Sequence, residues 1–313
     1  MELVTGGAGF IGSHLVDSLV GKGKRVRVLD NFSSGREEFL SHHSGSEVVE
    51  VVRGDLLDID SVRSAMAGVE TVHHMAANPD IRLGTSVTDT DLRQGTIATY
   101  NVLESMRLEG VSRISFSSSS AVYGEASQMP TPETYGPILP ISLYGASKLA
   151  SEALITAWCG TFGAKSWVHR FANIVGPRGT HGVIYDFVHK LKDDPSRLEV
   201  LGDGRQEKSY MSAEDCVGAM LHLVDAVDDE VNLFNLGTGD TCSVSRIAEI
   251  VVEESGFEGV SIEYTGGDRG WAGDVPKTSL DVESLFSTGF VPRMKSEQAI
   301  RDTARALIGE IGL

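Results

Sequence analysis

The chain has 313 residues, of which 41% are hydrophobic and 23% charged, a composition that excludes a disordered protein. Its formal net charge of -17 disfavours nucleic acid as a partner, because so negative a surface repels phosphate backbones. No apolar run approaches the roughly 18 residues of a membrane span, and the N-terminus lacks a signal-peptide pattern. We therefore expect a cytoplasmic protein that does not bind membranes.

Short β-branched runs alternate with helical patterns through the first half of the chain. The expected strands are residues 3–5, 25–30, 48–53, 71–74, 114–117 and 167–171. The expected helices between them are 13–21, 60–66, 96–110 and 144–162. Strands that alternate with helices form parallel βαβ units. The pattern thus predicts an α/β fold with a Rossmann-type, doubly wound parallel sheet.

Beyond about residue 176 the pattern changes to short helices and loops rich in Gly, Asp and Pro. Strands are expected at 198–201 and 260–264, and helices at 215–225 and 244–255. We expect a first domain over residues 1–175, to which segments around 210–237 return, and a smaller α/β lobe over 176–313.

The composition holds two further signals. Nine lysines against eighteen arginines, with 44 acidic residues, fit either a protein adapted to high internal salt or a merely acidic one. The three cysteines, Cys159, Cys216 and Cys242, lie far apart, so they offer neither a metal-ligand spacing nor a disulfide framework. We expect buried free thiols and no metal site.

A glycine-rich turn follows the first strand and precedes a helix. Gly6, Gly9 and Gly12 permit positive φ and close approach, which a pyrophosphate seated on a helix N-terminus requires. Asp30 ends the second strand, where its carboxylate would accept hydrogen bonds from an adenosine ribose and repel a 2′-phosphate. NAD is therefore expected rather than NADP. Asp55, beside Leu56, suits either an adenine contact or the cap of the next helix.

Tyr144 and Lys148 stand four residues apart, on one face of an expected helix. A phenol has an ordinary pKa near 10, so it is protonated at neutral pH. A neighbouring ammonium and a cationic nicotinamide would both favour the phenolate, and lowering its pKa to about 7 requires roughly 4 kcal/mol. The pair predicts a general base that acts on a substrate hydroxyl while NAD accepts a hydride.

Together these motifs resemble the extended short-chain dehydrogenase/reductase superfamily, and within it the nucleotide-sugar epimerases, above all those that act on UDP-glucose. Residues 74–77, 117–124, 170–173, 210–215, 235–237 and 266–276 carry the resemblance further along the chain. The resemblance implies Ser119, Tyr144 and Lys148 as catalytic residues. The first domain would bind NAD, and the smaller lobe would bind the nucleotide sugar.

The resemblance also implies contacts for both ligands. Those expected for NAD are Gly6, Gly9, Phe10, Ile11, Gly12, Asp30, Asn31, Ser33, Ser34, Gly35, Asp55, Leu56, Met75, Ala76, Ala77, Gln94, Ser117, Ser118, Tyr144, Lys148 and Phe171. Those expected for the substrate are Ser119, Tyr144, Asn173, His181, Val183, Lys208, Arg269 and Thr278. Among Ser117, Ser118 and Ser120, at least one hydroxyl is expected to cap a helix or face solvent instead.

Several positions depart from the family pattern or admit a simpler role. Gln94 and Gly95 stand where the family has asparagine, and Trp271 replaces an arginine. Lys208 and Ser209 replace an Arg-Asp pair, so a bidentate phosphate clamp becomes a point charge. Lys208 and Arg269 could be surface charges, and His181 a loop residue without a role. Thr278 is either a packing residue or small enough to admit N-acetylated sugars.

The residues after Ser119 bear on the reaction. A 4,6-dehydratase would carry an Asp-Glu pair there, and decarboxylating relatives a glutamate before Val-Tyr-Gly, whereas this chain has Ser120 and Ala121. The resemblance thus implies reversible 4-epimerisation, first of UDP-glucose and UDP-galactose, through a 4-keto sugar and tightly held NAD. Open alternatives are a 4-epimerase of UDP-GlcNAc, a uronate or a pentose, a dehydratase or reductase, and a non-catalytic NAD-binding module.

Family relatives also pair through two helices in each copy, which here correspond to residues 86–110 and 144–162. Ala146, Ala150, Ala153 and Ala157 give the second helix small side chains suited to close packing. We therefore expect a homodimer.

Overall fold

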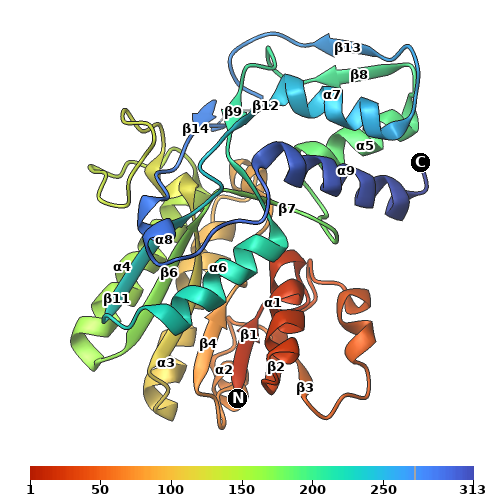
Figure 1. Cartoon of the computed structure of the whole chain (residues 1–313). Helices are drawn as coiled ribbons and strands as arrows, with labels where there is room; N and C mark the ends of the chain where they lie inside the picture. The colour runs from red at the N-terminus through yellow and green to blue at the C-terminus, as the bar shows by residue number, and fades with distance from the viewer. Residues whose placement is uncertain (271–272) are drawn as a thin grey trace. The chain divides into compact units, whose positions relative to one another are not determined.

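The computed structural model describes residues 1–270 and 273–313, so Trp271 lies outside the described residues. The chain divides into two compact units, each built from separate stretches of sequence (Figure 1). Unit 1 comprises residues 1–124, 138–170 and 217–234, and unit 2 comprises residues 125–137, 171–216 and 235–313. Across the described residues, no helix combines the length and apolar character needed to cross a membrane.

Unit 1 is built on a seven-stranded sheet with the strand order β11-β6-β5-β4-β1-β2-β3. The strands are β1 (Glu2–Thr5), β2 (Val26–Asp30), β3 (Val49–Arg53), β4 (Thr71–His74), β5 (Arg113–Ser119), β6 (Lys165–Phe171) and β11 (Val231–Leu236). The pairs β3–β2, β2–β1, β1–β4 and β4–β5 are all parallel. This order, which reverses between β1 and β4, is that of a Rossmann fold, and the predicted fold class is confirmed.

Helices cover both faces of this sheet. They are α1 (Phe10–Gly21), α2 (Ile59–Ala65), α3 (Ala98–Glu109), α4 (Leu143–Phe162) and most of α6 (Ala213–Ala226), with short helices η1 (Glu37–His43), η2 (Ile81–Thr85), η3 (Leu92–Ile97) and η4 (Ser120–Tyr123). Residues of α2, α3 and α4 share one hydrophobic cluster with the sheet, including Val62, Val102 and Ile155, while α1 packs on β1 and β2. Because crossovers are right-handed, reversal of the strand order places α1 on the opposite face.

The turn from β1 into α1 is held in shape by its glycines. Gly6 has a φ of +67°, and a Cβ atom there would lie 2.7 Å from the Cα of Ala76. A Cβ on Gly12 would lie 2.1 Å from the carbonyl oxygen of Gly6. The first turn of α1 can therefore approach the end of β1 only because both positions lack side chains.

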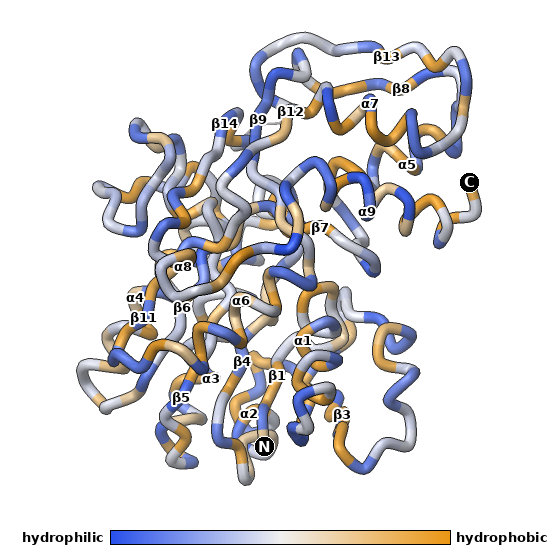
Figure 2. Tube along the Cα trace, viewed as in Figure 1, coloured by the Kyte–Doolittle hydropathy of each residue, from blue (hydrophilic) through white to orange (hydrophobic). Residues whose placement is uncertain are grey.

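Unit 2 contains short strands and amphipathic helices. The strands form three small sheets: β7 (Asn173–Val175) with β10 (Tyr210–Ser212), β8 (Arg197–Val200) with β13 (Ser261–Tyr264), and β9 (Glu207–Lys208) between β12 (Cys242–Ser243) and β14 (Lys277–Thr278). The helices are α5 (Val183–Asp193), α7 (Val244–Ser255), α8 (Glu283–Ser287) and α9 (Ser296–Ile311). Hydrophobic and hydrophilic residues alternate along α7 and α9, as expected for amphipathic helices that bury one face (Figure 2).

Apolar and ionic contacts join the helices of unit 2. Val188, Ile247 and Ile300 come from α5, α7 and α9 and belong to one buried cluster. Arg246 on α7 pairs with Glu297 on α9 at 2.7 Å. The three cysteines of the chain are buried and free, as the sequence predicts.

We expect Gly12→Ala to destabilise the protein by about 1–3 kcal/mol, because the added methyl group meets the backbone of Gly6. Thermal unfolding measures the effect. Gly21→Ala is the matched control on the same helix, because a Cβ there meets no atom within 4 Å. A Gly12→Ala protein as stable as the control would contradict the assigned packing.

Candidate active site

Polar residues gather at the carboxyl ends of the parallel strands in unit 1, where the strand order reverses and open α/β sheets bind their ligands. The turn after β1 is shaped for an anion. Helix α1 begins after Gly9. This residue has an extended backbone and no side chain that could cap the N–H groups of the first turn. Phe10 and Ile11 are the first helical residues. An anion at this end would meet uncapped N–H groups and the positive end of the helix dipole.

Asp30, at the end of β2, is tied to this turn. Its buried carboxylate accepts hydrogen bonds from the backbone N–H groups of Ala8, at 2.9 Å, and Phe32, at 2.8 Å. Gly35 lies so close that a Cβ there would be 2.9 Å from the carboxylate. Each oxygen keeps a further lone pair that can accept from a ribose hydroxyl.

The loop after β2 contacts the loop after β3. The Asn31 amide donates to the Asp55 carboxylate at 3.1 Å, and that carboxylate also accepts from the backbone N–H of Leu57 at 2.8 Å. Helix α2 is capped by Asp58 instead, so the alternative assignment of Asp55 as the helix cap is wrong. The side chain of Leu56 packs in the hydrophobic core.

The other residues expected at the cofactor occupy nearby strand ends or loops. Met75 follows β4 and donates its backbone N–H to the carbonyl of Thr5 at 3.2 Å. Ala76 lies against Gly6. The remaining residues lie in the loop before η1, just after β4, in η3 and at the end of β6: Ser33, Ser34, Ala77, Gln94 and Phe171.

Ser119, Tyr144 and Lys148 meet where β5 ends and α4 begins. Ser119 caps η4 by accepting the backbone N–H of Ala121 at 3.2 Å, and it also hydrogen-bonds Tyr144. The Lys148 ammonium donates to the carbonyl oxygen of Ser117 at 2.5 Å and lies 5.7 Å from the centre of the Tyr144 ring. The three residues predicted to be catalytic are thus brought together, and the helix-capping hydroxyl is that of Ser119 itself.

A buried ion pair that the sequence analysis missed stands behind this group. Glu152 lies one helical turn beyond Lys148, and its carboxylate accepts from the Arg170 guanidinium at 3.0 and 2.7 Å. The Ser118 hydroxyl donates to the same carboxylate, and Arg170 donates to the hydroxyl of Tyr123 at 2.9 Å. The spacing of Tyr144, Lys148 and Glu152 by four residues was the available signal, since it places all three on one helical face.

Burial sets the acidity of the two central groups. It raises the pKa of Tyr144 to about 12, against the opposing effect of the Ser119 hydrogen bond, and the carboxylate of Asp91 raises it further. Burial lowers the pKa of Lys148 to about 8, against the charges of Glu152 and Asp91. Within the chain alone, burial of the phenol thus sets the direction, so the lowered pKa that we expect in the presence of both Lys148 and the nicotinamide cation stays a prediction.

Unit 2 gathers three of the residues expected at the substrate. Lys208 on β9 pairs with the buried carboxylate of Asp274 at 2.6 Å, and Arg269 donates to the carbonyl of Asp274 at 2.9 Å. Arg269 also pairs with Glu125. Thr278 on β14 lies directly opposite Lys208 in the sheet. Lys208 is thus a largely buried, paired cation, and the alternative of a surface charge is wrong for it.

The other three substrate candidates lie on the chain from β7 to α5. Asn173 opens β7 and donates its side-chain amide to the carbonyl of Ser209 at 3.1 Å, next to Lys208. His181 is exposed in the loop that follows, beside Thr180. Val183 is the first residue of α5.

The residues present fit NAD. A glycine turn that a Cβ would obstruct and an uncapped helix N-terminus suit a pyrophosphate, while the buried Asp30 carboxylate suits a ribose diol.

Known proteins resemble the chain over nearly its whole length. It is 34% identical over 309 residues to a Methanocaldococcus jannaschii protein that carries the provisional name UDP-glucose 4-epimerase, with 96% of each chain covered. It is also 34% identical over 264 residues to UDP-glucuronic acid decarboxylase 1 of Arabidopsis thaliana. The matched region covers 80% of this chain and 57% of that protein.

Solved structures agree in fold. A crystal structure of a UDP-galactose 4-epimerase is 41% identical, with a TM-score of 0.87 and 99% of each chain covered. The UDP-N-acetylglucosamine 4-epimerase of Methanobrevibacter ruminantium is 26% identical, with a TM-score of 0.87 and coverage of 99% and 98%.

The model of the NAD dependent epimerase/dehydratase family matches residues 2–237. The chain therefore belongs to this family of nucleotide-sugar enzymes, whose cofactor is NAD.

Proposed function

We propose that the chain catalyses the reversible 4-epimerisation of UDP-glucose and UDP-galactose in the cytoplasm, with NAD held throughout turnover. The observation that carries this proposal is the meeting of Ser119, Tyr144 and Lys148 at the end of β5. The similarity to 4-epimerases over almost the full chain supports it.

The residues that follow Ser119 favour epimerisation over the other reactions of the family. Ser120 and Ala121 begin η4, and neither side chain is a carboxylate. A 4-keto sugar formed here would meet no acid or base at these two positions to expel a 6-hydroxyl. Return of the hydride to the opposite face of C4 is then the simplest outcome, and it yields the 4-epimer.

Oxidised NAD, if bound, would supply a positively charged nicotinamide ring that becomes neutral when it takes up the hydride. Side chains of the protein transfer the proton of the sugar's 4-hydroxyl. The Tyr144 phenolate removes the proton of the 4-hydroxyl, and Ser119, already hydrogen-bonded to Tyr144, holds that hydroxyl in line. On the return step Tyr144 gives the proton back to the same oxygen.

The magnitude of the Tyr144 shift indicates why two cations are needed. Moving its pKa from about 12 to neutrality requires about 7 kcal/mol. One ammonium 5.7 Å from the ring supplies about 3 kcal/mol at an effective dielectric constant of about 20. Lys148 thus contributes under half, and the nicotinamide charge is the natural source of the rest.

The state of Lys148 depends on the ion pair behind it. Burial lowers the pKa of Lys148 to about 8, and the negative charge of Glu152 keeps it from falling further. Arg170 donates two charge-assisted hydrogen bonds to the Glu152 carboxylate and so fixes its position beside Lys148. We infer that Glu152 and Arg170 are positioning residues that keep the Lys148 ammonium charged at neutral pH.

The cations of unit 2 suit the diphosphate of the substrate. Lys208 and Arg269 both contact Asp274, so they are held near each other. We propose that they bind the diphosphate and that Asn173, whose amide bonds the carbonyl beside Lys208, assists them.

Thr278 supports a second substrate class. It lies opposite Lys208 in the β9–β14 pair, and its side chain would take up less space beside a bound sugar than a larger residue would. A structural neighbour with 26% identity is a UDP-N-acetylglucosamine 4-epimerase. We therefore propose that UDP-GlcNAc is also epimerised.

We also propose that two copies associate through α3 and α4. Ala146, Ala153 and Ala157 are exposed along α4, beside the exposed apolar side chains of Leu143 and Phe162. On the α3 side, Ile97, Tyr100 and Leu108 are exposed. Exposed apolar residues on neighbouring helices are typical of a protein interface.

Tyr144→Phe should lower turnover of UDP-galactose by about 10²- to 10⁴-fold, because the variant keeps the ring but loses the proton acceptor. The assay incubates purified protein with UDP-galactose and no added cofactor, and bound NAD is quantified separately. Epimer formation by the wild type would exclude a non-catalytic module. Near-normal turnover by Tyr144→Phe would contradict the role of Tyr144, while accumulation of a keto product by the wild type would contradict epimerisation.

Glu152→Gln should lower the free energy of unfolding by about 3–5 kcal/mol, because Arg170 loses its buried partner. It should also shift the alkaline limb of the pH–rate profile to lower pH, since the pKa of Lys148 then falls below about 8. Denaturant unfolding and kcat at several pH values measure the two effects. Glu37→Gln, at an exposed ion pair with Arg53, is the matched control and should change neither.

Wild-type protein should turn over UDP-GlcNAc as well as UDP-glucose, and Thr278→Tyr should lose the first activity while retaining the second. The larger side chain would fill the space that an N-acetyl group requires. Thr278→Val, which keeps the volume, is the control. Absence of UDP-GlcNAc turnover by the wild type would refute the extended specificity.

A further inference from the structure

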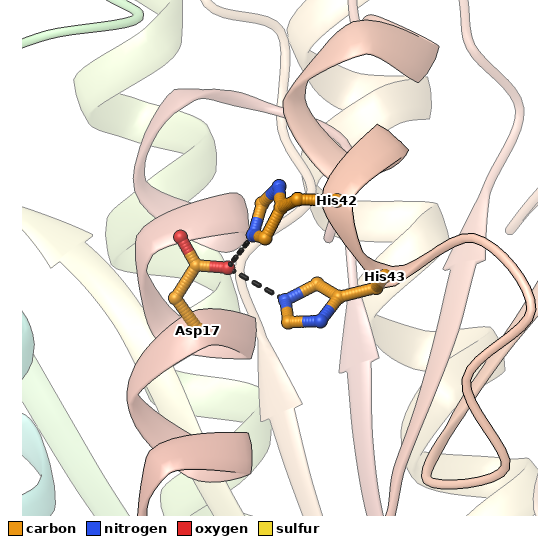
Figure 3. Close-up of side chains that lie close together, drawn as sticks. All are labelled: Asp17, His42 and His43. Carbon is orange, nitrogen blue, oxygen red and sulfur yellow. Dashed lines mark hydrogen bonds and ion pairs between the residues drawn. The ribbon is translucent and has the colours of Figure 1, made fainter.

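Three side chains that form no part of the proposed epimerase chemistry converge on the surface of unit 1. Asp17 lies on α1, and His42 and His43 are the last two residues of η1 (Figure 3). The Nε2 atoms of both imidazoles lie 2.7 Å from the same carboxylate oxygen of Asp17. Of the side chains in the described ranges, this is the one group of three whose potential metal-ligating atoms meet within 4.8 Å.

We propose that Asp17, His42 and His43 bind a divalent first-row transition ion, with Zn²⁺ as the representative. Two imidazole nitrogens and one carboxylate oxygen form a donor set that such ions accept, with water as a fourth ligand. Mg²⁺ and Ca²⁺ prefer oxygen donors throughout, so they should not compete. The proposal is independent of the epimerase activity.

The geometry needs only a small adjustment to hold the ion. Zn²⁺ bonds nitrogen and oxygen at about 2.0–2.2 Å, so the ligand atoms of a tetrahedral site stand about 3.3–3.5 Å apart. The two distances of 2.7 Å must therefore widen by about 0.7 Å. The His42 side chain is 48% exposed, so it can rotate and leave water access, while His43, at 12%, is already held by packing.

The surrounding charge favours a cation. Two neutral imidazoles and one carboxylate offset only part of a double positive charge, but the chain as a whole carries a net charge of -17. The imidazole rings lie 4.1 Å apart, centre to centre. A bound ion would accept the lone pair of one nitrogen from each ring.

The ion would link α1 to η1, which are separated in the sequence by β2 and the loop that follows it. Asp17 is in the middle of α1, and the histidines follow β2 and the loop after Asp30. Binding would fix η1 against α1, so the native state should be stabilised by the ion.

Isothermal titration of metal-free, tag-free, full-length protein with ZnCl₂ tests the proposal. The expected result is one Zn²⁺ per chain, at least tenfold weaker binding for each of Asp17→Asn, His42→Gln and His43→Gln, and unchanged binding for His222→Gln on α6. Titration with MgCl₂ should give no binding.

Thermal unfolding provides a second readout that is independent of catalysis. Zn²⁺ should raise the midpoint of the wild type and of His222→Gln, and should leave the midpoint of Asp17→Asn unchanged. Absence of Zn²⁺ binding would overturn the proposal and leave Asp17 as a hydrogen-bond acceptor for two histidines. Binding that all three variants retain would also overturn it, because the ion would then lie elsewhere.

Discussion

The buried pairing of Glu152 with Arg170 ties the middle of helix α4 to the end of β6. An unpaired buried charge would destabilise the folded protein, and here two hydrogen bonds join the Glu152 carboxylate to the Arg170 guanidinium. Ser118 donates a further hydrogen bond to Glu152, and Arg170 donates one to Tyr123. Lys148 sits one turn away and bonds the carbonyl of Ser117. The position of Tyr144, the proposed general base, and the charge of the Lys148 ammonium therefore both depend on an ion pair that contacts neither side chain.

Local sequence patterns predicted the first half of the fold well. The parallel strands and their helices are long enough to show a period, and only their ends moved by a few residues. Two amphipathic helices were nevertheless missed: α5, with Ile184, Phe187, Val188 and Leu191 buried at helical spacing, and α9. The strands β9, β12 and β14 have two residues each, so they exist only through long-range pairing and leave no local signal.

The residues of the candidate site likewise fall into those that local motifs predict and those that only long-range contacts bring together. The glycine turn, Asp30 and the Tyr144–Lys148 spacing are local features and were visible in the sequence. The partners Arg170 and Asp274 come from distant segments, as does the meeting of Asp17 with His42 and His43, so no spacing announces them. The direction of the Tyr144 pKa could not be predicted either, because burial of the phenol depends on how completely its surroundings pack.

The interleaving of the two units constrains how the protein forms during synthesis. Strand β11 completes one edge of the seven-stranded sheet, and Ser166 on β6 donates its backbone N–H to the carbonyl of Glu230 at 3.0 Å. The buried Trp167 donates to the carbonyl of Val227 at 3.2 Å. A nascent chain that lacks these residues leaves β6 as an unpaired edge strand, which can pair with other chains and aggregate. Unit 1 can therefore fold completely only after residues 217–234 have been synthesised.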